Sequence, residues 1–426
     1  MSEGGSRARR DAPGGRVLLI LLLAYIFNFI DRQIIGVLAV PIKAELELSD
    51  TQLSLMGGIA FALFYSGLAI PIAWLADRKS RVNIIAVSVA LWSGFTALCG
   101  LAQNFWHLFL ARMGVGIGEA GGVAPSYALI SDFFPKEKRG RALAFFSLGI
   151  PIGSALGVFF GGWIAQNLDW RAAFIIVGLA GLPAALLVKL GVPEPVRGGF
   201  DSADGAPSEP APPFLAVAAT LARTPSFWLL SFGAASGSIL GYGLIFWLPS
   251  FFSRSFGLEL AEVGWFYGTI VLIGGVAGTW LGGWFGDKVG PGNPAAYALI
   301  PAICFLIAAP VFAAGLFAPS LAVGWMLFAI GQMLALAWLG PVIAAVQHIV
   351  PPNMRATASA SFLFINNLIG IGFGIFFLGF MSDTMSAAYG AESLRYSILY
   401  GLGFYALSGL IYLAASRRLA RDWYAA

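Results

Sequence analysis

The sequence is poor in charge and poorer still in the residues that bind metals. Asp, Glu, Lys and Arg make up 11% of its 426 residues, and it contains only two histidines and two cysteines. Cys99 and Cys304 lie far apart inside apolar runs, so they predict neither a disulfide framework nor a metal site. The histidines are too few for a cluster, and the sequence has no nucleophile-elbow pattern. We therefore expect no metal, no cofactor and no enzyme activity.

Long apolar runs fill the sequence instead. The residues AVILMFWYC make up 58% of the chain, and its mean hydropathy is +0.82. A run of about 20 apolar residues is long enough to cross a bilayer as a helix. Twelve such runs fall at 17–42, 52–76, 82–102, 106–132, 140–165, 171–192, 226–252, 261–285, 295–317, 321–348, 356–384 and 393–416. The sequence predicts an all-α membrane protein with 12 transmembrane helices, whose surroundings are the lipid bilayer.

A segment rich in Pro, Gly, Asp and Ser divides these runs into two sets of six. We expect an N-terminal six-helix bundle at residues 1–192, a cytoplasmic linker at 193–225 and a C-terminal six-helix bundle at 226–426. Within the linker, residues 214–223 predict a short helix at the membrane surface. We expect the protein to be a monomer.

The basic residues are distributed unevenly between the two sides of the predicted membrane. With a cytoplasmic amino terminus and a change of side at each span, nineteen Lys and Arg residues fall on the cytoplasmic side and four on the other. Basic residues accumulate in cytoplasmic loops, so both termini are predicted to be cytoplasmic. The net charge of +4 then reflects topology, and we expect no nucleic-acid partner.

Two internal matches indicate a duplication. Residues 125–144 align with residues 341–360 at a constant offset of 216, and Asp77 aligns with Asp287 at an offset of 210. Both matches keep the same order relative to the predicted spans. The chain is therefore predicted to consist of two pseudo-symmetric six-helix bundles.

The loop after the second run combines an acid with several bases, in the sequence DRKSR at residues 77–81. The pattern resembles the loop signature of the major facilitator superfamily, in which such residues tie helix ends together on the cytoplasmic side. A loop that only sets topology would need the bases but not an Asp at equivalent places in both halves. We interpret the pattern as a cytoplasmic gate that forms in one conformation and releases in another. Its predicted members are Asp77, Arg78, Arg81, Arg139, Asp287 and Arg355.

Glycines recur every four residues in two of the predicted spans. One stripe runs from Gly114 to Gly122 and the other from Gly149 to Gly161. Small residues at this spacing let helix backbones approach closely in a membrane, so we expect tight helix packing along both stripes.

Four charged residues lie deep inside the predicted spans, and all belong to the first half. They are Asp31, Arg32, Arg112 and Glu119. In the alignment of the two halves, Phe328 is equivalent to Arg112 and Ala335 is equivalent to Glu119. Charges that only held a symmetric bundle together would be expected in both halves, so the asymmetry favours a functional site over a scaffold of neutralising pairs.

Helix geometry indicates how these charges are arranged. Arg112 and Glu119 are seven residues apart, which places them on nearly one face and about 10 Å apart along the axis. Asp31 and Arg32 project about 100° apart and need different partners. We expect Arg32 to face Glu119 or a substrate, and Asp31 to face the central cavity. Asp31, with Glu119 second, is our candidate for proton coupling, because a buried carboxyl group can take up a proton when it separates from its Arg.

Several stretches together resemble the spinster family of the major facilitator superfamily. They are DRQIIGVL at 31–38, LADRKSR at 75–81, FW at 105–106, RMGVGIGEA at 112–120, IPIGS at 150–154, DWR at 169–171 and PEPVRG at 193–198. The resemblance covers the first half well, and the second half shows mainly the general facilitator pattern. It implies a rocker-switch transporter of sphingolipids or lysophospholipids, in which the four buried charges form the polar site. The compact amino terminus and short loops resemble bacterial members, which implies the bacterial inner membrane.

The resemblance also implies which residues line the substrate pathway, since the seventh, tenth and eleventh helices surround the pore in this superfamily. A buried Arg that holds an anionic head, beside an aromatic wall for the tail, would suit an amphiphile. The expected substrate-binding residues are Arg32, Arg112, Asn28, Tyr242, Phe246, Trp247, Trp338, Asn366 and Asn367.

These observations predict a secondary active transporter of an amphipathic, lipid-like or drug-like molecule, working by alternating access and coupled to protons. The alternative is a proton-coupled transporter of small organic anions, in which Arg32 and Arg112 bind a carboxylate. A membrane enzyme acting on lipid and a channel are alternatives from other classes. The first lacks a recognisable catalytic pattern, and solute counterflow would distinguish the second from a transporter.

Overall fold

The computed structural model describes residues 14–76, 78–195, 213–290, 292–351 and 354–424. Over these residues the chain forms helices joined by short turns, and it contains no β-strand. Asp77 and residues 196–212 lie outside the described residues.

The first half forms a series of helices that covers the first six predicted spans. They are α2 (Gly14–Val37), α3 (Ala39–Leu46), α4 (Asp50–Ser54), the π-helical turn η1 (Leu55–Ile59), α5 (Ala60–Ala76), α6 (Arg81–Cys99), α7 (Phe105–Glu119), α8 (Val123–Phe133), α9 (Lys136–Ser147), α10 (Gly149–Asn167) and α11 (Trp170–Gly191).

The second half repeats this pattern after the short connecting helix α12 (Phe214–Ala222). Its helices are α13 (Pro225–Phe256), α14 (Leu260–Val289), α15 (Ala296–Leu316), α16 (Leu321–Leu336), α17 (Leu339–His348), α18 (Arg355–Tyr389), the 3₁₀ turn η4 (Gly390–Glu392), α19 (Ser393–Gly401) and α20 (Gly403–Leu419). Helix α12 confirms the short helix predicted within the linker.

Every predicted span has a helical counterpart. Ten stretches of the described chain are long and apolar enough to cross a membrane. One of them, Thr357–Leu419, contains both α18 and the pair formed by α19 and α20. The fourth predicted span is interrupted by a turn between α7 and α8. The helices of the described chain cover all 12 predicted spans, and the protein is a multi-pass integral membrane protein.

The fourth and tenth spans break at equivalent places, which supports the duplication. Turns separate α7 from α8 at residues 120–122 and α16 from α17 at residues 337–338. In the first turn the helix tightens, since Gly122 N–H donates to the carbonyl of Glu119 at 3.0 Å. The break leaves Glu119 as the last residue of α7, in the middle of its span.

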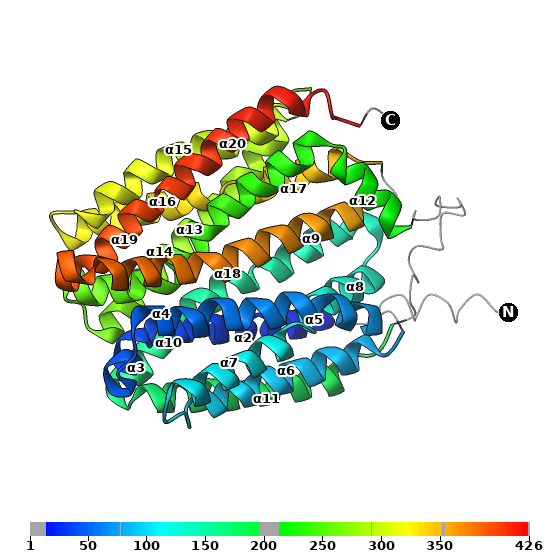
Figure 1. Cartoon of the computed structure of the whole chain (residues 1–426). Helices are drawn as coiled ribbons and strands as arrows, with labels where there is room; N and C mark the ends of the chain where they lie inside the picture. The colour runs from blue at the N-terminus through cyan, green and yellow to red at the C-terminus, as the bar shows by residue number, and fades with distance from the viewer. Residues whose placement is uncertain (1–13, 77, 196–212, 291, 352–353, 425–426) are drawn as a thin grey trace.

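The helices form two groups that meet along two seams. Helix α2 packs against α10 and α11, while α13 packs against α18 and α20. Between the groups, α10 contacts α14, and α18 contacts α4, η1 and α5. Figure 1 shows α12 and the last turn of α20 at one end of the molecule, here called the terminal end. Helices α3, α4 and α19 lie at the opposite end, here called the α3 end.

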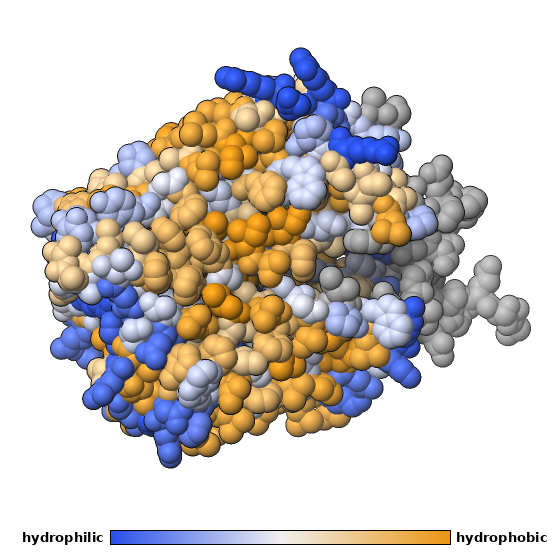
Figure 2. Space-filling view, viewed as in Figure 1, coloured by the Kyte–Doolittle hydropathy of each residue, from blue (hydrophilic) through white to orange (hydrophobic). Residues whose placement is uncertain are grey.

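The surface matches a protein that sits in a bilayer. Figure 2 shows hydrophobic residues over most of the visible face, with hydrophilic residues gathered towards its two ends. Large apolar side chains are exposed on this surface, including Trp106 (64%), Trp265 (63%) and Trp280 (66%). In a bilayer these side chains contact lipid, so their exposure costs no hydrophobic free energy.

The glycine stripes lie at close helix contacts, as predicted. A Cβ atom built on Gly118 would lie 2.5 Å from the backbone nitrogen of Trp92, and one on Gly153 would lie 2.5 Å from the carbonyl oxygen of Ile26. Helix α7 therefore touches α6, and α10 touches α2, at distances that only glycine permits.

Gly282 and its neighbour Gly283 offer a matched test of this packing. A Cβ atom on Gly282 would lie 2.1 Å from the carbonyl oxygen of Ala337, whereas one on Gly283 would have nothing within 4 Å. We expect Gly282→Ala to lower stability by about 1–3 kcal/mol because α14 must move away from the turn before α17. Gly283→Ala should be neutral or slightly stabilising, because Ala favours the helix. Thermal unfolding in detergent checks both, and equal melting temperatures would contradict the packing described here.

Candidate functional site

The four predicted charges of the first half lie together between α2 and α7. Arg32 Nε donates to Glu119 Oε2 at 2.6 Å, which joins the middle of α2 to the end of α7. The Glu119 side chain is fully buried and that of Arg32 is 14% exposed. The expectation that Arg32 faces Glu119 is therefore met. Because both charges are removed from water, each depends on the other for its stabilisation.

Asp31 does not point where we expected. Its exposed fraction is 1%, and its charged neighbours, Glu119 and Arg112, both belong to α7. Arg112, itself 2% exposed, reaches the backbone carbonyl of Asp31 with Nη1 at 3.4 Å. The Asp31 carboxyl group thus lies inside the first half, not on a central cavity. The physical reason is that Arg32 takes the face of α2 directed at Glu119, so the residue before it turns deeper into the bundle.

Aromatic rings surround the Arg32 guanidinium group. Its central carbon lies 5.1 Å from the ring centroids of Phe29 and Phe61 and 4.5 Å from that of Tyr65. Cation–π attraction at such distances stabilises a guanidinium group in a desolvated place.

Several buried polar atoms of this cluster have no hydrogen-bond partner among the described residues. They are both amide atoms of Asn28, Oδ1 of Asp31, Nη2 of Arg32, Nε of Arg112 and Oε1 of Glu119. Buried polar atoms are usually satisfied, so this concentration marks a place suited to water, protons or a polar group of a ligand.

A second polar group comes from the other half. Ser238 Oγ donates to Asn366 Oδ1 at 2.8 Å, and Tyr242 Oη donates to Asn367 Oδ1 at 3.3 Å. Tyr242 on α13 lies within electrostatic range of Arg32. The structure thus brings Tyr242 and the two asparagines, which the sequence predicts as substrate-binding residues, to the region that faces Arg32.

The three other predicted aromatic residues are mainly packed. Phe246 is 4% exposed and Trp247 is fully buried, with the Trp247 indole N–H donating to the carbonyl of Ile375 at 3.0 Å. Trp338 is 7% exposed and lies 6.3 Å from the ring centroid of Phe362. The role of these residues in substrate binding stays a prediction.

The predicted cytoplasmic gate lies at the terminal end, apart from Asp77, which is outside the described residues. Arg81 pairs with Asp132, Arg139 Nε donates to the carbonyl of Phe134 at 3.0 Å, and Arg355 Nε donates to that of Gln347 at 3.0 Å. Each of these contacts stays within one half. The remaining members are exposed: Arg78 stacks over Trp74 at 3.9 Å, and Asp287 lies within electrostatic range of Tyr297.

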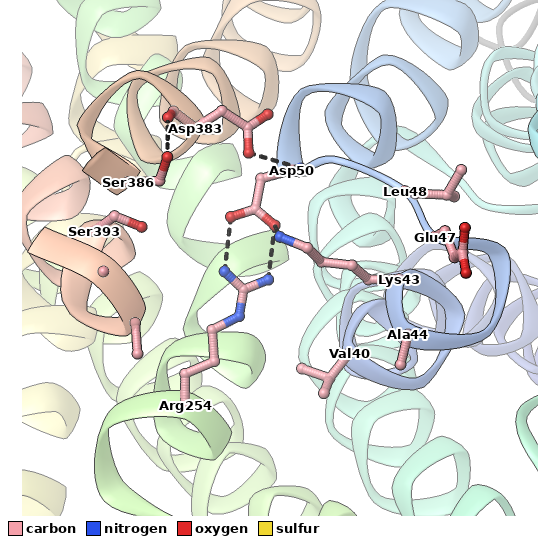
Figure 3. Close-up of a pocket in the computed structure, with 12 residues that line it drawn as sticks. Val40, Lys43, Ala44, Glu47, Leu48, Asp50, Arg254, Asp383, Ser386 and Ser393 are labelled. Atoms are coloured by element: carbon pink, nitrogen blue, oxygen red, sulfur yellow. Dashed lines mark hydrogen bonds and ion pairs between the residues drawn. The ribbon is translucent and has the colours of Figure 1, made fainter. Parts of the chain in front are cut away.

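The α3 end holds a charged group that the sequence analysis missed. Asp50 on α4 accepts two hydrogen bonds from Arg254 on α13, both at 2.7 Å, and one from Lys43 on α3 at 2.7 Å. Figure 3 shows these side chains pointing toward one another beside Asp383 of α18. Lys43 and Arg254 are two of the four basic residues that the charge distribution assigns to the non-cytoplasmic side. The signal that could have found the group is the presence of acids near the ends of the second and eleventh spans, on the side with few bases.

Metal and disulfide chemistry find no support among these residues. No group of three His, Cys, Asp or Glu side chains that could hold a metal occurs in the described parts of the chain. Cys99 and Cys304 are both free thiols.

Comparison with known proteins places the chain in a transporter family. Residues 21–375 match the family model of the Major Facilitator Superfamily. An MFS-type efflux pump of Mycolicibacterium smegmatis is 34% identical over 404 residues, covering 95% of this chain and 92% of the pump. Protein spinster homolog 1 of Mus musculus is 28% identical over 447 residues, covering 99% of this chain and 84% of that protein.

Solved structures show the same fold. A bacterial homolog of the human lysosomal transporter Spinster, in an inward-facing and unoccupied conformation, has a TM-score of 0.88 at 33% identity, covering 97% of this chain and 99% of that chain. A D-xylose–proton symporter has a TM-score of 0.68 at 17% identity, covering 96% of this chain and 98% of the symporter, and therefore shares the fold.

The pair formed by Arg32 and Glu119 can be tested by a double-mutant cycle. We expect Glu119→Gln to destabilise the protein by about 3–5 kcal/mol, because it leaves a largely buried guanidinium group without its counter-charge. Adding Arg32→Gln should recover part of that loss, with a coupling of about 1–3 kcal/mol. Chemical unfolding of the two single variants and the double variant measures the coupling. Strictly additive effects would show that the two side chains do not depend on each other.

Proposed function

Because this chain is a transporter that belongs to the major facilitator superfamily, we propose that it works by alternating access and couples substrate movement to protons. The observation that carries the proposal is the buried group of Asp31, Arg32, Arg112 and Glu119, with its unpaired polar atoms. The terminal end is proposed to face the cytoplasm and the α3 end the opposite side, as the distribution of basic residues predicts. The proposed location is the bacterial inner membrane.

The chemistry of proton coupling follows from the ion pair. A proton added to Glu119 removes the charge with which Arg32 pairs. The guanidinium group, still held by its aromatic neighbours, is then free to bind an anionic group of a substrate. Release of that group and loss of the proton restore the pair. Asp31 and Arg112 extend the cluster, so a proton on either carboxyl group changes the charge that Arg32 senses.

The substrate class follows from what faces Arg32. A guanidinium group lies on one side, while a tyrosine hydroxyl and two amides approach from the other half. Aromatic rings line the same region. This combination suits a molecule with an anionic or zwitterionic head and an apolar tail, such as a sphingolipid, a lysophospholipid or an amphipathic drug.

Small organic anions remain the second candidate. The observation that favours them is the pair of buried guanidinium groups, Arg32 and Arg112, which together could bind a dicarboxylate. Competition for binding between a lysophospholipid and a short dicarboxylate would separate the two candidates.

Transport into proteoliposomes tests the proton step. With a fluorescent lysophospholipid as substrate, we expect Asp31→Asn and Glu119→Gln each to lower uptake driven by a pH gradient by roughly tenfold or more, a change equivalent to about 1.4 kcal/mol. Exchange of substrate without a gradient should fall less, because the neutral side chains imitate the protonated state.

The matched control is Asp169→Asn, since Asp169 caps the start of α11 at the surface and lies outside the cluster. It should keep gradient-driven uptake. If Asp31→Asn and Glu119→Gln also kept full gradient-driven uptake, the proposed proton coupling would be wrong. If only a dicarboxylate were transported, the substrate class would change to the second candidate.

A further inference from the structure

We propose that Asp50, Arg254 and Asp383 form a latch that holds the α3 end of the transporter closed and that must part for this end to open. The inference rests on the alternating access proposed above and goes beyond it, because it names the residues that set the balance between the two states. The latch is distinct from the buried cluster, which lies within the first half and cannot join the two halves.

Asp50 is the centre of the latch. Its carboxylate accepts hydrogen bonds from three other elements: two from Arg254, one from Lys43 at 2.7 Å and one from Ser382 Oγ at 2.8 Å. The Asp50 side chain is only 2% exposed, and its bidentate pair with Arg254 crosses from α4 in the first half to α13 in the second. Paired and shielded contacts of this kind are the strongest that an arginine makes.

Asp383 closes the same seam from the opposite direction. Its carboxylate accepts from the backbone N–H groups of Asp50 at 3.1 Å and Thr51 at 2.7 Å, and from the Thr51 hydroxyl at 2.6 Å. These are the first two N–H groups of α4, which a helix leaves without an internal partner. The Ser49 hydroxyl accepts from the third, that of Gln52, at 3.1 Å. A helix of the first half thus depends on an acid of the second half for its N-terminal cap.

Close apolar packing lies next to the latch on the same seam. A Cβ atom on Gly379 would lie 1.8 Å from Ser54 Oγ, and one on Gly57 would lie 2.3 Å from the Phe246 ring. Gly57 belongs to the π-helical turn η1, and such turns often occur at functional sites. On the second seam, Gln166 Oε1 accepts from Ala261 N–H at 2.7 Å. The α3 end is therefore closed along both seams, with the latch as the charged contact.

The charges of the latch and of the neighbouring Lys43 are divided evenly between the two halves. Lys43 and Asp50 belong to the first half, and Arg254 and Asp383 to the second, so each half keeps one positive and one negative group. Asp50 retains its bond to Lys43 after Arg254 leaves. The latch also borders a pocket of about 540 Å³ whose lining includes these four residues. Opening therefore separates the shielded pair of Asp50 and Arg254 while Asp50 keeps Lys43 as its counter-charge.

A distance measurement across the α3 end tests the latch without any substrate. Spin labels are placed at Leu168 and Ala388, which are exposed and belong to different halves, after Cys99 and Cys304 are replaced by alanine. Pulsed electron paramagnetic resonance in nanodiscs then reports the populations of closed and open α3 ends. We expect Asp50→Asn to raise the ratio of open to closed molecules by about tenfold, equivalent to about 1.4 kcal/mol. Asp383→Asn should shift it in the same direction.

The matched control is Glu45→Gln. Glu45 pairs with Arg171 at 2.7 Å at the same end, but both residues belong to the first half. The Trp170 N–H and Arg171 lower the pKa of Glu45, so it is a paired carboxylate like Asp50. Its variant should leave the distances unchanged. Unchanged distances in both Asp50→Asn and Asp383→Asn, or an equal shift in Glu45→Gln, would overturn the latch.

Asp50→Asn and Asp383→Asn change the latch from opposite halves. If one variant fails to fold, the other still tests the latch. A failure of the proposed substrate or proton coupling would appear in uptake and leave the distance distributions as expected. A failure of the latch would appear in the distances even if uptake responded as proposed.

Discussion

The ion pair between Arg32 and Glu119 is the contact on which the rest of the first half depends. A charge in the middle of a membrane protein needs a partner, and here the partner sits at the broken end of α7. The glycines of α7 and α10 bring their helices close enough to α6 and α2 to enclose the pair. Arg32 pairs with Glu119, the Asp31 side chain lies deeper in the bundle, and Arg112 donates to the Asp31 carbonyl. One contact thus fixes the order of the whole cluster.

Because the two halves are related by duplication, a charged residue present in only one half points to a role beyond the shared fold. Both halves break their fourth helix at the same place, yet only the first places a carboxylate there. The second half offers Tyr242 and two asparagines, which hydrogen-bond without changing charge near neutral pH. The first half therefore carries the buried charges, including the carboxyl groups proposed to take up a proton, and the second half carries neutral polar side chains. At the α3 end the two halves share charges equally, which suits a contact that forms and breaks in each cycle.

Much of the fold could be predicted from local patterns, but much of the site could not. The length of apolar runs is a local property, so the spans and the repeat were found from the sequence, and the spacing of Arg112 and Glu119 placed them on one face. The contacts of Asp50 with Arg254 and Asp383 join residues 204 and 333 positions apart. No local pattern records such pairing. Asp31 shows the same limit, because periodicity gives the angle between two neighbours and not which of them meets the partner helix.

The arrangement of α2 and α13 gives a physical route between the buried cluster and the closed end. Arg32 and Gly36 are four residues apart on α2, and Tyr242 and Phe246 are four apart on α13, so each pair lies on one helix face. Arg32 lies near Tyr242, and a Cβ atom on Gly36 would lie 3.0 Å from the Phe246 carbonyl oxygen. One helical turn therefore separates Arg32 from a close contact between α2 and α13. On the proposed mechanism, a rotation of α2 on protonation of Glu119 would change the packing of α2 against α13, and α13 carries Arg254 of the latch.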